Sequence, residues 1–502
     1  MIDRLLVLAI ALIAALVPSV GSAAGPATGA VLQYHNDSER SGLYVLPGLT
    51  AQAARGVHRD RQFQAEIAGP VYAQPLYWVP PGGGRPMLIV TTEQDAVYAL
   101  DATTGATIWK RILGLPAPRS ALPCGDIDPM GITGTPVIDG QSGVLYLDAM
   151  VRPSPRAVPQ HEVFALRVSD GSVLPGWPVD VARALAARGE GFIARNQGER
   201  GALAIVGNRL SVPYAGHFGD CAYYHGWVIG ISLQNLASLS HWATGGQGGG
   251  IWGQGGIVSD GRALYVATGN TIGVRRWAGG EAVIRLGLAL DFSGAARDFF
   301  APRNWNQLDD EDLDLGGTNP ALVALPDGSG QSFIVQFGKD GNAYLLDRAN
   351  LGGIGGALAV THVSTVPIRT APATFVNGRA AYVVFEGQGI GCPGGLSGDL
   401  VALRVNSGSP PSLTVAWCAE EHGKGAPIVT TSDGANDPIV WAVGAEGDDR
   451  LHGFRGNDGA VVFDGGGAEE AMAHLHRFQT LIAAGGRLYV ASDSTVYAFA
   501  FP

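Results

Sequence analysis

The feature that most limits the fold of this 502-residue chain is a hairpin pattern that recurs along it. Each copy has an alternating apolar strand, and most copies continue with a polar turn ending in Gly and a second apolar stretch that often ends on Trp. The eight copies begin at Val97, Val163, Trp227, Val283, Ala343, Leu400, Leu451 and Val496. Successive copies lie about 45 to 66 residues apart, which is the spacing of propeller blades or solenoid coils.

Further strand signals between the copies, such as PMLIVTT, ALYVATG and RLYVASD, complete a four-stranded unit. A sheet this small cannot bury both of its faces alone, so radial packing is expected. We therefore predict an all-β fold, an eight-bladed β-propeller of four-stranded antiparallel blades, with seven blades as the alternative. The last copy reaches Pro502, and its final strand is expected to pair with residues 30–36, AVLQYHN, and so close the ring.

The composition agrees with a fold of short strands and tight turns. The chain has 74 Gly, and only 15% of its residues are charged, so good helix formers are scarce. The formal net charge is -11 and no basic cluster appears, which argues against a nucleic-acid-binding surface.

The first residues have the features of a secretory signal. Arg4 precedes the apolar run LLVLAIALIAALV, and the small residues GSAAG follow. Because that run is too short to span a bilayer comfortably, we interpret residues 1–24 as a cleaved signal peptide, with a membrane anchor as the alternative. Residues 25–502 are interpreted as a single propeller domain without a membrane span, located in the periplasm or secreted.

The four cysteines allow two disulfides in three pairings in an exported protein. We predict a bridge between Cys392 and Cys418 from their proximity in sequence alone. None of the cysteines lies in a C-x-x-C motif, so no zinc site and no covalently attached haem is indicated.

The segment ALDATTGATIW, which ends at Trp109, matches the tryptophan-docking motif A-x-D-x-x-T-G-x-x-x-W. In this respect the chain resembles the quinoprotein alcohol dehydrogenase family, whose members depend on pyrroloquinoline quinone (PQQ), from about residue 60 to its end. The resemblance implies that tryptophans at repeat positions pack on the next blade. Four residues take this structural role: Trp109, Trp177, Trp242 and Trp417.

Residues 248–270, GGGIWGQGGIVSDGRALYVATGN, resemble the family segment in which a Trp forms the floor under PQQ and an Asn ligates calcium or a lanthanide. The resemblance implies that Trp252 stacks on PQQ and that Asn270 is a metal ligand. A planar quinone needs an aromatic face, and a hard cation prefers oxygen ligands. The alternative is a core Trp and a turn Asn with a positive φ angle.

Residues 306–320, NQLDDEDLDLGGTNP, resemble the W-D-x-D strand of the same enzymes, with Glu311 in the position of the Trp. The resemblance implies that Asp312 is the catalytic base and that Asp312 and Asp314 are metal ligands. On a strand, carboxylates at positions i and i+2 share one face. The alternatives are a solvated acidic loop and a peripheral calcium site unrelated to catalysis.

Residues 338–353, GKDGNAYLLDRANLGG, resemble the segment whose Lys or Arg binds the quinone carbonyls, which implies that role for Lys339. A solvated hairpin tip is the alternative. The order Trp252, Asn270, Asp312, Lys339 reproduces the order in the family, and this joint agreement is more specific than any single residue.

Three positions depart from the family pattern. Gly125 replaces the second of two adjacent cysteines, and Met130 replaces an Arg that pairs with a cofactor carboxylate. Where a metal-binding Glu is expected the chain has Cys221, with Asp220 beside it as a substitute metal ligand.

The resemblance implies an exported PQQ-dependent dehydrogenase that oxidises an alcohol or sugar hydroxyl and uses Ca²⁺ or a lanthanide. Because no haem segment is present, electrons would pass to a separate acceptor such as a cytochrome c. The first alternative is a non-catalytic binding or scaffold propeller that has lost the cofactor. A lyase or hydrolase with its site in the central channel is a third reading, since propellers host many chemistries.

Overall fold

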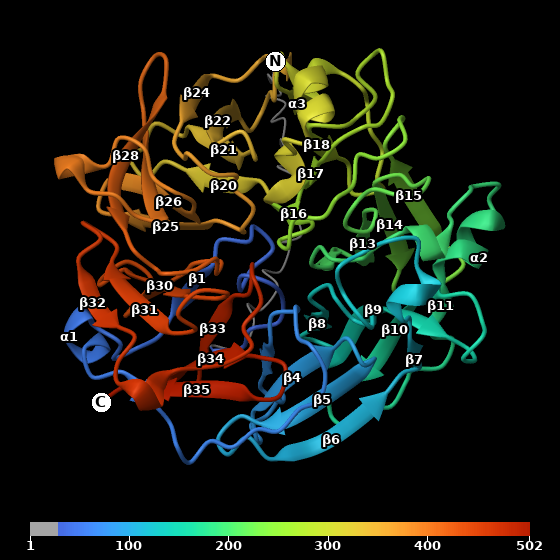
Figure 1. Ribbon diagram of the computed structural model, residues 1–502, viewed down its shortest axis with the longest axis horizontal. Helices are drawn as coiled ribbons and strands as arrows, with labels where there is room; N and C mark the ends of the chain where they lie inside the picture. Colours follow the sequence, from blue (N-terminus) through green and yellow to red (C-terminus); the bar gives the residue numbers. More distant parts are fainter. Residues whose placement is uncertain (1–28) are drawn as a thin grey trace, which may run out of the picture.

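The computed structural model describes residues 29–502. Eight sheets stand around a central axis as the blades of a propeller (Figure 1), so the prediction of eight blades is confirmed. Five sheets have four strands, and three have a fifth strand. The first sheet consists of β3 (Leu76–Trp78), β4 (Met87–Thr92), β5 (Ala96–Asp101) and β6 (Thr107–Ile112).

The other sheets follow around the ring in nearly the order of the chain. The second sheet contains β7 (Leu115–Pro116), β8 (Val137–Asp139), β9 (Val144–Arg152), β10 (Gln160–Arg167) and β11 (Val179–Asp180). The third contains β12 (Ala204–Val206), β13 (Arg209–Tyr214), β14 (Trp227–Ser232) and β15 (Leu239–Ala243). The fourth contains β16 (Val258–Ser259), β17 (Leu264–Thr268), β18 (Ala282–Leu286), β19 (Phe299–Ala301) and β23 (Gly353–Ile354). The fifth sheet contains β20 (Ala321–Ala324), β21 (Ser332–Phe337), β22 (Asn342–Asp347) and β24 (Ala359–His362). The sixth contains β25 (Ala373–Asn377), β26 (Ala380–Glu386), β27 (Leu400–Asn406) and β28 (Ser412–Ala419). The seventh sheet contains β1 (Leu43–Val45), β29 (Ile428–Thr431), β30 (Ile439–Val443), β31 (Leu451–Arg455) and β32 (Val461–Asp464). The eighth contains β2 (His58–Arg59), β33 (Leu481–Ala484), β34 (Arg487–Ala491) and β35 (Val496–Ala500).

Helices are few and short among residues 29–502. The α-helices are α1 (Ala51–Ala54), α2 (Val181–Ala186) and α3 (Trp305–Glu311), and the 3-10 turns are η1 (Arg119–Ala121), η2 (Ala194–Asn196), η3 (Ala296–Asp298), η4 (Leu315–Gly317), η5 (Pro393–Gly395) and η6 (Ala468–Glu470). The strands pair antiparallel, except that β1 pairs parallel with β29 and β19 pairs parallel with β23.

The ring is closed by a different N-terminal segment from the one expected. Strand β2 pairs antiparallel with the last strand, β35, with His58 opposite Ala500. Residues 30–36 do not pair with β35. Instead Val31 forms an isolated bridge with Tyr77 of β3, in the first sheet. The expectation was wrong because closure needs only two residues of backbone pairing, and the apolar pattern of residues 30–36 serves burial at the hub of the ring, where Tyr34 and His35 are buried.

The core lies between neighbouring blades, and repeat tryptophans connect them. Trp417 of β28 is buried and donates its Nε1–H to the Gly456 carbonyl of the next blade at 2.8 Å. A Cβ added to Gly459 would lie 2.7 Å from the Trp417 ring, so the glycine allows close packing. Trp109 of β6 makes the same kind of contact from the first sheet to the second, with a bond of 2.9 Å from its Nε1–H to the Val168 carbonyl. These contacts are the packing that the tryptophan-docking motif implies.

The four cysteines form two disulfides. Cys392 is bonded to Cys418, which confirms the predicted bridge, and Cys124 is bonded to Cys221. Disulfides indicate an oxidising, extracytoplasmic compartment. Among residues 29–502 no helix is long and apolar enough to cross a membrane. The predicted signal peptide, residues 1–24, lies outside the described residues.

Candidate functional site

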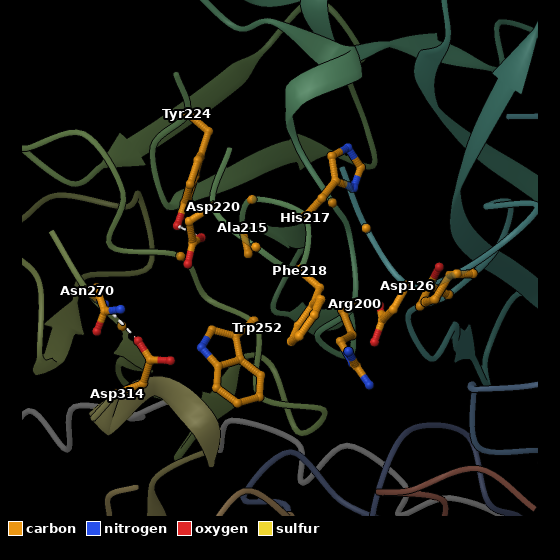
Figure 2. A pocket seen from close by; sticks show the side chains of 18 of the residues that line it. Asp126, Arg200, Ala215, His217, Phe218, Asp220, Tyr224, Trp252, Asn270 and Asp314 are labelled. Atoms are coloured by element: carbon orange, nitrogen blue, oxygen red, sulfur yellow. Dashed lines mark hydrogen bonds between the residues drawn. The ribbon is translucent and has the colours of Figure 1, made fainter. Parts of the chain in front are cut away.

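A cavity of about 520 Å³ is lined by loop segments that come from different blades. Every residue that the sequence predicts for the site lines this one cavity: Asp220, Trp252, Asn270, Asp312, Asp314 and Lys339. Figure 2 shows Trp252 at its centre, with Asn270 and Asp314 on one side. The fold therefore brings together side chains that are up to 119 residues apart in the sequence, from Asp220 to Lys339.

Trp252 lies in the loop between β15 and β16, and glycines let the backbone approach its indole ring. A Cβ at Gly317 would lie 3.1 Å from Cη2 of Trp252, and a Cβ at Gly269 would lie 3.2 Å from Nε1. The Lys339 Nζ lies 5.4 Å from the ring centroid, within the range of a cation–π contact. The indole is thus fixed at its edges, and it lines the cavity rather than filling a core.

Asn270 follows β17 and is held by the two neighbouring aspartates. Its backbone N–H donates to Asp314 Oδ1, and its side-chain Nδ2 donates to Asp312 Oδ1, both at 2.9 Å. Its Oδ1 is buried and has no hydrogen-bond partner among the described residues. Asn270 also lacks the positive φ angle of the turn alternative. The amide oxygen is therefore oriented and available, as a ligand atom must be.

Asp312 and Asp314 do not lie on a strand, so that expectation was wrong. Asp312 caps the C-terminus of α3 in the left-handed conformation, with φ 55°, and Asp314 immediately precedes η4. The helix buries Leu308, and Trp305 packs against an apolar cluster of the core, while the two acidic residues at the end of the helix are exposed. Both carboxylates nevertheless contact Lys339 Nζ, that of Asp312 at 2.9 Å. The left-handed cap, rather than strand alternation, brings the two together.

Lys339 lies in the tight turn between β21 and β22, yet it is not a solvated tip. Its side chain is 12% exposed, and its backbone N–H donates to the Asp314 carbonyl at 3.0 Å. Burial alone would lower the pKa of Lys339, but the negative charges of Asp314 and Asp312 outweigh it and raise the pKa. The ammonium group therefore stays charged at neutral pH.

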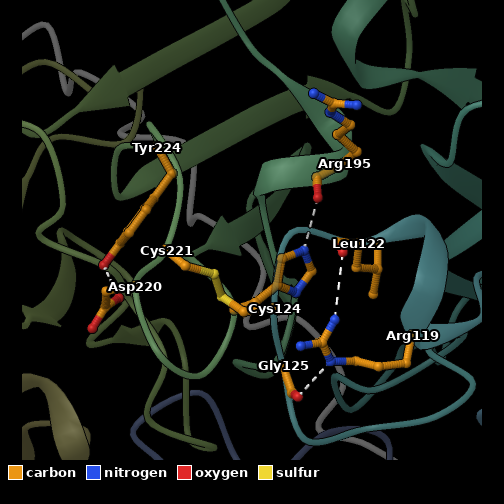
Figure 3. The surroundings of a disulfide bond; sticks show 9 residues. Arg119, Leu122, Cys124, Gly125, Arg195, Asp220, Cys221 and Tyr224 are labelled. Carbon is orange, nitrogen blue, oxygen red and sulfur yellow. Dashed lines mark hydrogen bonds between the residues drawn. A yellow bond between two sulfur atoms is a disulfide. The ribbon is translucent and has the colours of Figure 1, made fainter.

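Asp220 approaches this cluster from the loop after β13. The Tyr224 hydroxyl donates to its Oδ1 at 2.5 Å. Burial raises the pKa of Asp220, and the charges of Asp314 and Asp312 raise it further. The adjacent Cys221 ties this loop to Cys124, so the disulfide joins two segments of the cavity wall (Figure 3).

The donor set matches a hard cation in type and in charge. An unpaired amide oxygen stands beside three carboxylates that face a single ammonium group, which leaves excess negative charge. The carboxylates are not arranged as a finished cage: over residues 29–502, no group of three or more His, Cys, Asp or Glu side chains has the spacing of a metal site. A cation would have to draw these oxygens together.

The departures from the family pattern also lie in this wall. Gly125 has φ 126°, and its carbonyl accepts a hydrogen bond from Arg119 Nε at 2.8 Å (Figure 3). Met130 is buried and lines the cavity. It offers no charge there.

Arginines that sequence reasoning missed supply charge elsewhere in the cavity. Arg200, Arg369 and Arg477 all line it. None of the three belongs to a segment that resembles a family motif, so only their shared position in the folded ring identifies them.

Comparison with solved structures shows that several alcohol and methanol dehydrogenases have a similar propeller fold. The chain is similar to a quinohemoprotein alcohol dehydrogenase from Comamonas testosteroni, with a TM-score of 0.62 and 14% identity over 95% of this chain and 81% of that chain. A quinohemoprotein alcohol dehydrogenase from Pseudomonas putida HK5 gives a TM-score of 0.62 and 13% identity, over 94% and 80% of the two chains. A europium-containing methanol dehydrogenase gives a TM-score of 0.62 and 14% identity, over 93% and 90%.

At these identities the likeness establishes a shared fold. No protein-family model and no curated protein matches the sequence.

Proposed function

We propose that this protein is an exported PQQ-dependent dehydrogenase that oxidises an alcohol or sugar hydroxyl. The observation that carries the proposal is the meeting of Trp252, Asn270, Asp312 and Lys339 in one cavity. These residues come from four separate segments, each of which resembles a family motif in sequence. The likeness in fold to alcohol and methanol dehydrogenases supports it.

The cavity suits a planar, negatively charged cofactor. Its volume of about 520 Å³ is within the range of small-molecule sites, and the indole of Trp252 offers a flat face. Lys339 places a positive charge above that face. Asn270, Asp312, Asp314 and Asp220 are the residues that would hold Ca²⁺ or a lanthanide. When bound, the quinone supplies the acceptor for the hydride that leaves the substrate carbon.

Asp312 is suited to the role of general base by its hydrogen bonds. Its Oδ1 accepts from Asn270 Nδ2 and from Lys339 Nζ, and these two donors orient the carboxylate. Neither bond uses Oδ2, which is left to take the proton of the substrate hydroxyl. The carboxyl side chain is 69% exposed, so a substrate can reach it from solvent.

The remaining parts of the proposal follow from the sequence. The mature chain, residues 25–502, would be exported by its signal peptide to the periplasm or beyond. Electrons would leave through a separate acceptor such as a cytochrome c.

The proposal is tested with purified apo-protein. PQQ is added with Ca²⁺ or with La³⁺, unbound cofactor is removed, and the absorption of the retained quinone is recorded. Reduction of a redox dye is then followed with a panel of alcohols and sugars. Retained quinone and substrate-dependent dye reduction are expected, and the absence of retained quinone at saturating cofactor would contradict the proposal.

A second candidate is a binding or scaffold propeller that has lost the cofactor. It is favoured by Met130, which leaves the cavity wall uncharged where the family has an Arg, and by the lack of a finished metal cage among the described residues. The same experiment separates the two functions, because a scaffold protein that has lost the cofactor would retain no quinone.

A further inference from the structure

Arg200 is a cationic side chain that lines the main cavity. Its side chain makes no hydrogen bond and no ion pair within residues 29–502, and its Cζ lies 5.1 Å from the centroid of the Phe478 ring. Burial lowers the pKa of Arg200, and the negative charge of Asp126, which lines the same cavity, partly offsets this. Arg477, by contrast, lines the same cavity and pairs with Glu446 at 3.0 Å. A guanidinium group has five N–H donors, so those of Arg200 remain free.

A ligand larger than water can reach the free donors of Arg200 only from the main cavity. Arg200 also borders a second cavity, which it shares with Thr133 and Gln254, but the volume there is about 10 Å³. That space is enough for about one water molecule. A ligand larger than water must therefore reach Arg200 from the side of Trp252.

The position of Arg200 gives the cavity two chemically different ends. In Figure 2, Asn270 and Asp314 lie on one side of Trp252, and Arg200 lies on the other. The first end contains Asp220, Asp312 and Asp314 with Lys339. At the second end Phe218 contributes apolar surface, and the Asp126 carboxylate lies near Arg200 (Figure 2). Arg200 forms no ion pair with Asp126, so its guanidinium is the positive charge that a planar anion lying across Trp252 would meet.

We propose that Arg200 binds a carboxylate of the cofactor and so replaces the arginine that is missing at Met130. The inference rests on the proposed function, because PQQ is the tricarboxylate concerned. A guanidinium group forms two parallel hydrogen bonds with a carboxylate, and a partly buried site strengthens them. The charge thus enters the cavity from a different segment of the chain, the one that leads into β12.

The test is equilibrium dialysis of apo-protein against PQQ with Ca²⁺, with dissociation constants for the wild type and three variants. Arg200→Met keeps the length of the side chain without its charge and is expected to weaken binding about 10- to 100-fold. Arg200→Lys keeps the positive charge but cannot form the two parallel hydrogen bonds, so its affinity for PQQ should lie between those of the wild type and Arg200→Met. Arg455→Met is the control, expected within about threefold of wild type because Arg455 is paired with Asp458 at 2.8 Å and does not line the cavity.

A second experiment measures the dissociation constant of the PQQ trimethyl ester, in which the three carboxylates carry no charge, for the wild type and for Arg200→Met. If Arg200 binds a carboxylate, wild type and Arg200→Met should bind the ester with equal affinity. Equal PQQ affinity in wild type and Arg200→Met, or an equal loss with acid and ester, would overturn the inference alone. Failure of the wild type to bind PQQ would instead overturn the proposed function.

Discussion

At the scale of single residues, the site depends on hydrogen bonds that orient charged groups. Lys339 contacts both Asp312 and Asp314, and Asn270 donates to both aspartates as well. Each of these four residues thus fixes at least two of the others. The order of the motifs in the sequence indicated which residues would meet, but not these contacts, because the left-handed cap at Asp312 is a property of the folded helix end.

Replacing Asp312 by Asn tests the proposed base. Asn keeps an Oδ1 acceptor for Asn270 and Lys339 but cannot take a proton, so turnover should fall about 10²- to 10⁴-fold. Quinone affinity should fall much less than turnover, because the Asn amide oxygen can still face Lys339 and the metal. Thermal stability should stay near that of the wild type, because the side chain is largely exposed. Steady-state dye reduction and equilibrium dialysis measure the two quantities. Turnover within about threefold of wild type would assign the base to another group.

At the scale of elements, Trp109 and Trp417 each connect one blade to the next, and a disulfide connects two segments of the cavity wall. The tryptophan pattern in the sequence was sufficient to predict the contacts of Trp109 and Trp417. The Cys124–Cys221 bridge follows from the sequence only as the pair that Cys392–Cys418 leaves over. Its place in the cavity wall could not be predicted, because 97 residues separate the two cysteines and only the closed ring brings them together.

Trp417→Ala should lower the free energy of unfolding by about 3–5 kcal/mol, because it leaves a cavity between two blades and leaves the Gly456 carbonyl without its indole donor. Val376→Ala, at an exposed position of the same sheet, should change it by about 0.5 kcal/mol or less. Urea unfolding measures both variants. Equal effects would contradict the role of Trp417 between blades.

The two disulfides should contribute similarly to stability but differently to quinone binding. Removing either pair with serines should cost about 2–4 kcal/mol of stability. Only Cys124→Ser with Cys221→Ser should also weaken quinone binding, by about tenfold, because the freed loop carrying Asp220 must be ordered again on binding. The pair Cys392→Ser with Cys418→Ser, outside the cavity lining, is the control. Equal quinone affinities in both double variants would show that the Cys124–Cys221 disulfide does not organise the site.

At the scale of the whole molecule, the ring buries several carboxylates between its blades. Burial raises the pKa of Glu386 to about 8, with the charge of Asp399 adding to the effect, and burial raises the pKa of Glu93 to about 7. The folded state therefore binds protons more tightly than the unfolded chain at these positions. The stability that they contribute is fully present below about pH 4.5 and is lost as the pH rises towards 8.

Glu386→Gln should remove part of this pH dependence. Gln resembles the protonated carboxyl group, so the variant should gain stability over the wild type between about pH 4.5 and 8, at about 1.4 kcal/mol per pH unit at most. Urea midpoints measured across this range, on wild type and variant side by side, provide the check. Parallel curves would mean that Glu386 does not titrate in this window.

The sequence predicted the architecture well because repetition enforces it. Eight copies of one hairpin allow few arrangements, whereas the closing strand β2 is only two residues long and carries no pattern of its own. The same contrast holds for the site. Residues within recognisable segments, such as Trp252 and Lys339, could be selected beforehand. Arg200 could not, because its importance comes from its neighbours in the ring.

The most direct measurement is a crystal structure of the protein with PQQ and Ca²⁺. The account predicts a quinone ring that lies flat on the Trp252 indole, with Lys339 within hydrogen-bonding distance of its carbonyl oxygens and Asn270 Oδ1 on the metal. A cavity without quinone density at saturating cofactor, or a quinone bound away from Trp252, would contradict it.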